Sequence, residues 1–169
     1  MCARNGKLLR CCECGSECRE DETRLVDDTP VCLTCLYGDI TPVVVRPIGF
    51  VRKLDKHADD VSEIHLAPGM RRFMRGLADE THLTIVWQFH RQGPIKSVFS
   101  RGWDSKRVGP FASRTPHRLT PIAVTDVELL KVHGTTLRVR GLEAIDGTPV
   151  LDIKVSIKSL KRGGPRAAT

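Results

Sequence analysis

The chain has 169 residues, of which 40% are apolar and 28% charged, which fits one globular domain or one domain with a small satellite and excludes a disordered or fibrous chain. No apolar run approaches roughly 18 residues, the length of a membrane span, and the opening MCARNGKLLRCCECG lacks the apolar stretch of a secretory signal, so we expect a cytoplasmic protein with no membrane partner. The net charge of +7 is uneven, since residues 1–40 carry −3 and residues 41–169 carry +10. The basic piece can attract nucleic acid, although a protein that merely has a high isoelectric point fits the charge equally well.

The first predicted element is a zinc-knuckle module in residues 1–40. Six of the seven cysteines lie between positions 11 and 35, and two Cys-x2-Cys pairs are separated by 17 residues. Such pairs supply the four thiolates of a tetrahedral zinc site. A disulfide framework and an iron–sulfur cluster are the alternatives, disfavoured by a reducing compartment and by the spacing. The predicted zinc ligands are Cys11, Cys14, Cys32 and Cys35.

This module resembles the short zinc finger of the DksA/TraR type. In that resemblance Cys18 takes an apolar packing position, and Cys12 is exposed or a spare ligand. About 40 residues bury little core, so we expect the metal to supply most of the folding energy. The module could contact a partner protein, contact RNA or cap the main domain, and its negative charge argues mildly against RNA.

The residues from 41 to 157 are predicted to form a mainly β domain. Residues 82–90 alternate in hydropathy and place Leu83, Ile85, Trp87 and Phe89 on one face of a strand. Further strands are predicted at 121–132, 137–141 and 150–155, with turns at 133–134 and 146–149. One helix is expected over residues 68–79, with Met70, Phe73, Met74 and Leu77 on one side. Short strands joined by turns predict a single-sheeted antiparallel β-barrel with little helix.

Two stretches are basic and irregular. Residues 91–120 hold seven Lys/Arg and a single acid, Asp104, and a loop of that length is usually functional. Residues 158–169 are expected to form a basic flexible tail, which is either solvated or contacts RNA. Polar residues lie at both ends of the long loop and in the turn at 146–149. Each of them also fits the description of an ordinary turn or surface residue with no role in binding. A hydrolase is disfavoured because no nucleophile motif is present.

Two long motifs carry a resemblance to the TsaA-like family. They are GPFASRTPHRLTPI at residues 109–122 and RGLEAIDGTPVLDIK at residues 140–154, and the segments PIGFVR (47–52) and WQFH (87–90) are similar to the family's opening and central strands. The similarity covers about residues 44–156 and leaves the zinc module outside. It implies a homodimeric barrel that binds S-adenosylmethionine and methylates N6 of threonylcarbamoyladenosine beside the tRNA anticodon.

The resemblance also implies site residues. It places cofactor contacts at His90, Arg91, Arg114, Val124, Asp146, Gly147, Thr148 and Pro149. Arg114 suits the cofactor carboxylate, because a planar guanidinium can bond two oxygens at once. His117 is the catalytic candidate, as the group that orients the substrate or accepts its proton.

The chain departs from the family pattern at several positions. Leu119, Thr120 and Ala123 stand where the family commonly has Pro, Asn and Gly, and the family's Pro-Arg-Gln loop has no counterpart between Arg52 and Glu63. Two alternatives therefore accompany the tRNA methyltransferase reading. One is a methyltransferase for a different acceptor, and the other is a non-catalytic RNA- or protein-binding adaptor built on the same barrel.

Overall fold

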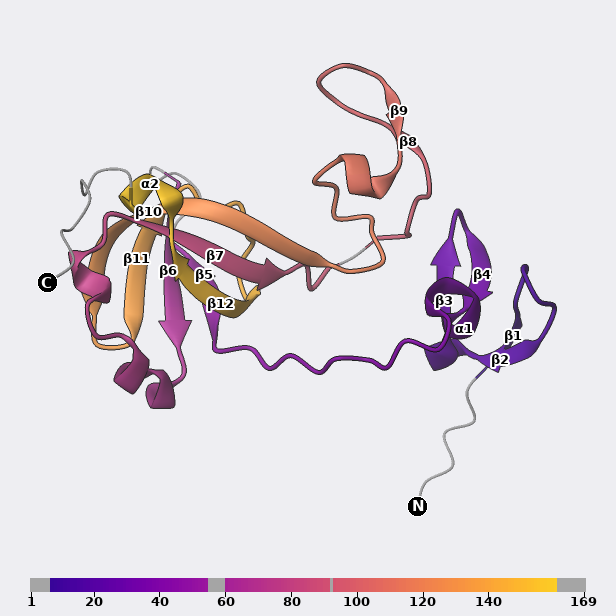
Figure 1. Ribbon diagram of the computed structural model, residues 1–169, viewed down its shortest axis with the longest axis horizontal. Helices are drawn as coiled ribbons and strands as arrows, with labels where there is room; N and C mark the ends of the chain where they lie inside the picture. Colours follow the sequence, from indigo (N-terminus) through magenta and orange to yellow (C-terminus); the bar gives the residue numbers. More distant parts are fainter. Residues whose placement is uncertain (1–6, 55–59, 92, 161–169) are drawn as a thin grey trace, which may run out of the picture. The chain divides into compact units, whose positions relative to one another are not determined.

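The computed structural model describes residues 7–54, 60–91 and 93–160 of the chain (Figure 1). The chain divides into two compact units. One unit comprises residues 1–44 and 91–121, and the other comprises residues 45–90 and 122–169. Among the described residues, no helix has the length and apolar character that crossing a membrane requires.

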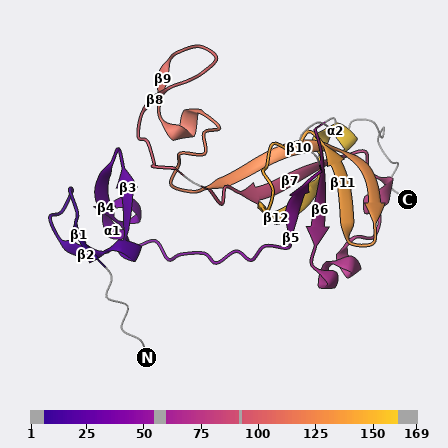
Figure 2. The same ribbon diagram turned by 180° about the vertical axis from the view of Figure 1, so that it is seen from behind.

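The second unit is built on a closed antiparallel barrel (Figures 1 and 2). Its strands are β5 (Gly49–Lys53), β6 (Val61–Leu66), β7 (His82–Gln88), β10 (Ile122–His133), β11 (Thr136–Arg140) and β12 (Pro149–Val155). They pair in the order β10-β11-β6-β5-β12-β7, and β7 pairs back with β10. Closure gives each of these strands a neighbour on both sides. The prediction of a mainly β, single-sheeted antiparallel barrel with little helix is confirmed.

The barrel core follows from the alternation in β7. Leu83, Ile85 and Trp87 are buried in the barrel, and each buried large aliphatic side chain contributes about 1.5–3 kcal/mol through removal of apolar surface from water. The indole Nε1 of Trp87 donates to Oγ1 of Thr125 at 3.1 Å, which satisfies its polar atom. Phe89 lies just beyond the strand, half-buried, with its ring 4.6 Å from that of Trp87.

Residues 68–79 differ from the single helix that the apolar spacing predicts. They form two 3₁₀ helices, η2 (Pro68–Phe73) and η3 (Leu77–Asp79), separated where Gly76 adopts a left-handed φ of 80°. Met70, Met74 and Leu77 pack against the barrel core as expected, but Phe73 is 74% exposed. Three of the four predicted apolar side chains therefore reach the core, and Phe73 does not.

The first unit contains the cysteine module, which we define as residues 7–40, and a long loop. The module consists of β1 (Leu8–Arg10), β2 (Glu17–Arg19), η1 (Glu20–Glu22), β3 (Thr23–Val26), β4 (Thr29–Cys32) and α1 (Leu33–Tyr37). Strand β1 pairs with β2, and β3 pairs with β4. The loop, residues 91–121, contains β8 (Phe99–Ser100), β9 (Arg107–Val108) and η4 (Pro110–Ala112).

This grouping differs from the expected division at residue 40, which assigns the loop to the barrel domain. The loop groups with the cysteine module because Ile95 forms a parallel bridge with Val26 at the end of β3. Residues 158–160 of the expected tail belong to a short helix. This helix, α2 (Ile157–Leu160), continues from the barrel, and Ser159 Oγ accepts from the backbone N–H of Thr81 at 3.2 Å. Residues 161–169 of the expected tail lie outside the described residues.

Candidate functional site

Four cysteine sulfur atoms converge in the cysteine module. Cys11 and Cys14 lie in the connection between β1 and β2, Cys32 ends β4, and Cys35 lies in α1. Their Sγ atoms all lie within 4.8 Å of one another, and the Cys11–Cys35 and Cys14–Cys32 pairs are each 3.9 Å apart. Four sulfurs held about 2.3 Å from one ion form a tetrahedron with edges of about 3.8 Å. The cluster therefore has the dimensions of a tetrahedral thiolate site.

Backbone amides stabilise negative charge on part of this cluster. The N–H of Cys32 points at Cys11 Sγ at 3.3 Å, and hydrogen bonds from the amides of Cys14 and Cys32 lower the pKa of Cys11 to about 6. The pKa of Cys35 is raised instead, chiefly by its side-chain hydrogen bond with Cys32. A metal binds thiolates rather than thiols. The cluster thus presents a preformed thiolate whose charge a cation would balance.

The two other described cysteines of the module have different roles. Cys18 packs against the small core of Cys11, Val31 and Cys32, as its apolar position predicts. Burial raises the pKa of its thiol, so it stays protonated. Cys12 is exposed and lies outside the group of four. All six described cysteines are free thiols, so none of them forms the alternative disulfide framework.

On the barrel, the structure brings His90 to the predicted turn at residues 146–149. Oγ1 of Thr148, which is fully buried, lies 3.2 Å from Nδ1 of His90. Gly147 has a left-handed φ of 76°, and its N–H donates to the carbonyl of Val51 at 2.8 Å. The turn is thereby fastened to β5. Asp146 Oδ1 adds a bond from the N–H of Lys53 at 3.0 Å.

A surface pocket of about 310 Å³ adjoins this turn. It is lined by Phe50, Val51, Arg52, His65, Asp146 and Gly147. The Phe50 ring, 54% exposed, offers an apolar face, while Arg52 and Asp146 offer opposite charges. Pockets that hold small molecules combine apolar walls with a few polar groups in this way.

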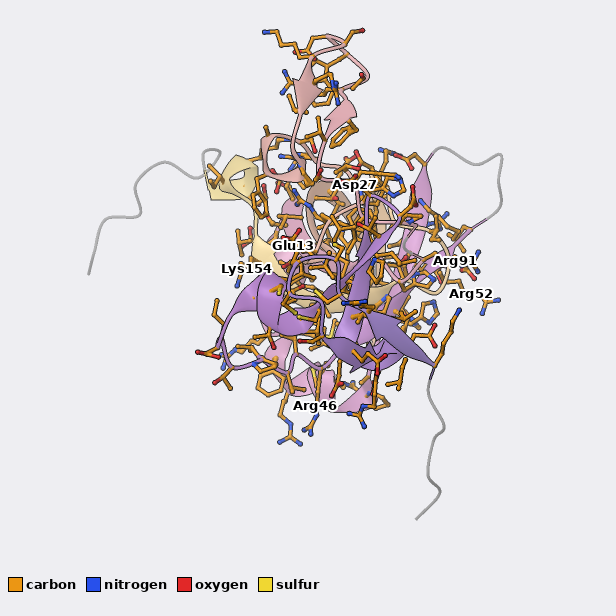
Figure 3. All side chains as sticks on the ribbon, turned by 90° about the vertical axis from the view of Figure 1, so that its right-hand side faces the viewer. Glu13, Asp27, Arg46, Arg52, Arg91 and Lys154 are labelled. Atoms are coloured by element: carbon orange, nitrogen blue, oxygen red, sulfur yellow. The ribbon has the colours of Figure 1, made fainter. Side chains whose placement is uncertain are left out.

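The sequence interpretation missed four of the residues that line this pocket, namely Phe50, Val51, Arg52 and His65. Phe50 and Arg52 alternate on β5 with the buried Gly49 and Val51, and Phe50 faces His65 across to β6. Figure 3 labels Arg52 of β5, which is exposed. The motif PIGFVR contains the signal for Phe50 and Arg52, because its period of two turns them away from the core. No local pattern in the sequence indicates His65 as a pocket residue, because His65 comes next to Phe50 only through the pairing of β5 with β6.

The other predicted site residues are placed as follows. Pro149 begins β12, and Val124 lies on β10, paired with Val86 and 52% exposed. Arg91, Arg114 and His117 belong to the loop in the first unit. Arg114 is exposed and forms no hydrogen bond or ion pair with the described residues.

His117 is held by a single ring nitrogen. Its Nδ1 lies 3.0 Å from the carbonyl oxygen of Pro94, and because a carbonyl only accepts, Nδ1 must donate. In neutral histidine the proton on Nδ1 leaves Nε2 as an acceptor. A Cβ at Gly93 would lie 2.9 Å from His117 Cε1, so glycine at this position leaves room for the ring. The contact with Pro94 therefore leaves Nε2 as the hydrogen-bond acceptor of a neutral His117 ring.

The barrel matches the model of a known protein family. The family model of the tRNA-methyltransferase O N-terminal domain matches residues 52–161. Residues 1–51, including the cysteine cluster, lie outside this match.

Individual relatives agree with that match. A probable S-adenosyl-L-methionine-binding protein of Methanothermobacter thermautotrophicus is 38% identical over 121 residues, covering 65% of this chain and 87% of that protein. Another from Archaeoglobus fulgidus is 34% identical over 122 residues, covering 66% of this chain and 33% of that protein. The tRNA (adenine(37)-N6)-methyltransferase of Mus musculus is 37% identical over 84 residues, 48% of this chain and 20% of the mouse protein.

A solved structure supports the same fold. The crystal structure of TrmO from Pseudomonas aeruginosa superposes with a TM-score of 0.56 at 25% identity, covering 76% of this chain and 61% of that chain. The chain therefore spans about three fifths of that TrmO chain, a third of the Archaeoglobus relative and a fifth of the mouse enzyme.

Proposed function

The chain belongs to the family of the tRNA-methyltransferase O N-terminal domain, and from this premise we propose that it is an S-adenosylmethionine-dependent tRNA methyltransferase. The observation that carries the proposal is the meeting of His90 with the buried Thr148 beside the barrel pocket. Both residues lie within the matched segment. Relatives named for S-adenosylmethionine binding and for adenine N6 methylation support the same activity.

For the acceptor we propose N6 of threonylcarbamoyladenosine next to the anticodon. S-Adenosylmethionine, when bound, supplies an electrophilic methyl group. The protein's part is to position the reactants and to receive the proton that leaves N6. Arg114 is unpaired among the described residues and can bond the cofactor carboxylate. His117 offers Nε2 as the proton acceptor because Nδ1 is committed to Pro94.

For cofactor binding we assign the pocket at the turn of residues 146–149. The Phe50 ring can stack on the adenine base, and the Asp146 carboxylate can accept from ribose hydroxyls. Gly147 allows close approach of the backbone, because it has no side chain on the pocket wall. His90, fixed through Nδ1 by Thr148, borders the same turn. The predicted Arg91 and Val124 contacts belong to the same proposal.

A positively charged row on the barrel supports tRNA as the partner. Lys131 lies directly opposite Arg138 across β10 and β11, and Arg138 lies opposite Glu63 across β11 and β6. With His133 and Thr136 these residues line a surface pocket of about 320 Å³. Like charges directly opposite each other destabilise a sheet. A phosphate group between Lys131 and Arg138 would relieve that repulsion.

Zinc and dimerisation complete the proposal. We assign zinc to Cys11, Cys14, Cys32 and Cys35 because the sulfur spacing matches a tetrahedral Zn–S₄ site. Such a reduced thiolate site favours a cytoplasmic location. A homodimer is supported by large apolar side chains exposed on the barrel, namely Phe50, Ile122, Val124 and Ile145.

The test is a methylation assay with two RNAs. Purified protein and S-adenosylmethionine are incubated with tRNA that carries threonylcarbamoyladenosine and with the same tRNA lacking it, and nucleosides are analysed by mass spectrometry. We expect a gain of one methyl group only on the modified nucleoside. A methyl group on another base would identify a different acceptor. Binding of tRNA without calorimetric binding of S-adenosylmethionine would favour the adaptor instead.

A further inference from the structure

The hairpin turn of the cysteine module is joined to the long loop by backbone hydrogen bonds. Beside the bridge of Val26 with Ile95, the N–H of Asp27 donates to the Ile95 carbonyl at 2.9 Å. The N–H of Ile95 donates to the Leu25 carbonyl at 3.3 Å. Ile95 is also buried, in contrast to the exposed Val98. The start of the loop is thus packed against the edge of the hairpin as a short strand would be.

Two carboxylates at the tip of the hairpin strengthen this junction. Asp27 accepts hydrogen bonds from both the N–H of Ser97, at 3.1 Å, and its hydroxyl. Asp28 pairs with Nζ of Lys96 at 2.8 Å. Both aspartates have left-handed φ angles, 48° and 67°, a conformation that costs energy for residues other than glycine. The turn therefore has a strained backbone, and in this conformation both aspartate side chains point to the loop.

A second contact lies near the other end of the loop. The hydroxyl of Tyr37, at the end of α1, donates to the Leu119 carbonyl at 3.5 Å. In the sequence, Tyr37 follows the last cysteine of the cluster by two residues, and Asp27 precedes Cys32 by five. The cysteine cluster thus lies between the two anchors. Arg114 and His117 lie in the span of loop between the two anchored positions.

We propose that the cysteine module is a positioning element for this loop, with Asp27 as its principal positioning residue. The proposal rests on the proposed function, in which Arg114 and His117 bind the cofactor and accept the proton. Closing a mobile loop around a ligand costs conformational entropy, and fixing its ends before binding removes part of that cost. A basic loop held by an acidic module also explains why the module carries net negative charge.

The primary experiment compares the full-length Asp27→Ala variant with wild type by hydrogen exchange, without any methyl donor. We expect faster exchange at amides 98–118, while amides of β7 and β10 keep their protection. Asp39→Ala is the matched control, since Asp39 is an exposed acid of the same module that no contact joins to the loop among the described residues. Asp27→Asn, which keeps an acceptor oxygen for the Ser97 N–H, should restore part of the protection.

Cofactor binding supplies the second readout. In Asp27→Ala we expect the Kd for S-adenosylmethionine to rise about tenfold, with zinc content unchanged. The double variant Asp27→Ala/Ser97→Ala should bind S-adenosylmethionine no more weakly than Asp27→Ala alone, because both changes remove the same interaction between Asp27 and Ser97. Unchanged exchange over residues 98–118 would overturn the proposal. If wild type itself does not bind S-adenosylmethionine, the proposed function fails, and the exchange experiment still decides whether the module holds the loop.

Discussion

The buried hydroxyl of Thr148 hydrogen-bonds Nδ1 of His90 at 3.2 Å, and this bond joins two segments 58 residues apart in the sequence. Thr148 follows the left-handed Gly147, whose N–H is fixed to β5. His90 follows the central strand β7 by two residues. The orientation of the imidazole at the barrel pocket therefore depends on a residue of the neighbouring turn.

Replacing Thr148 with valine should test this relationship. Valine keeps the volume of threonine but removes the hydroxyl, so we expect a loss of about 1 kcal/mol in the free energy of unfolding. His90 would then rotate more freely, and calorimetry should show weaker S-adenosylmethionine binding by about five- to tenfold. Thr135→Val, at a half-buried site in the β10–β11 connection, is the control and should leave affinity unchanged. Equal affinity in Thr148→Val and wild type would remove His90 from the binding site.

Arg114 gives a prediction specific to the cofactor carboxylate. Arg114→Ala should weaken binding of S-adenosylmethionine by at least tenfold, because a paired guanidinium–carboxylate bond is lost. Arg114→Lys should retain only part of the wild-type affinity for S-adenosylmethionine, since an ammonium group does not form the two parallel bonds. Calorimetry on both variants measures the effect. Arg107→Ala, in which another exposed arginine of the same loop is removed, should bind the cofactor as wild type does.

Zinc retention should depend on pH through the thiolates. The pKa of Cys11 is lowered from 9 to about 6, so the thiolate remains charged down to about pH 6, while its contribution to the stability of the folded module is full above pH 9, declines between pH 9 and 6, and is gone below about pH 6. Below that value protons compete with the metal, and metal release with unfolding of the module should follow. Mass spectrometry should find one zinc per chain at pH 8, and a chromogenic chelator should report its release on acidification. Cys35→Ser should lose zinc already at pH 8, whereas Cys12→Ser should retain it.

The Lys131–Arg138 pair predicts a change in RNA binding that is separate from any change in stability. Replacing both with glutamine should weaken tRNA binding and lower the slope of log K against log salt by about one for each phosphate that the variant no longer neutralises. The melting temperature should change little, because the gain from removing two facing positive charges is offset by loss of the pair between Arg138 and Glu63 across β11 and β6. Lys154→Gln is the control, since Lys154 pairs with Asp152 at 2.6 Å. A melting temperature that falls with unchanged RNA affinity would show that the pair serves only the fold.

Much of the fold is readable from local patterns in the sequence. The alternation over residues 82–90 predicted β7, since a strand with one buried face must repeat its apolar residues every second position. The spacing of Cys11, Cys14, Cys32 and Cys35 predicted a convergent sulfur cluster, and the structure has those four sulfurs together. In contrast, the 3.6-residue pattern over residues 68–79 did not predict the break at Gly76, because a left-handed glycine interrupts a helix without changing the apolar spacing.

By itself the sequence determined the barrel's strands other than β6, the sulfur cluster and the family to which the chain belongs, because these depend on spacing along one segment at a time. Only the tertiary structure decided that His65 joins Phe50 at the pocket and that the loop at residues 91–121 attaches to Asp27 of the cysteine module rather than grouping with the barrel. The physical reason is that strand register and hydrogen bonds between distant segments are set by how the whole chain packs. A local pattern records which face of a strand is buried, but it does not record which distant residue lies across from it.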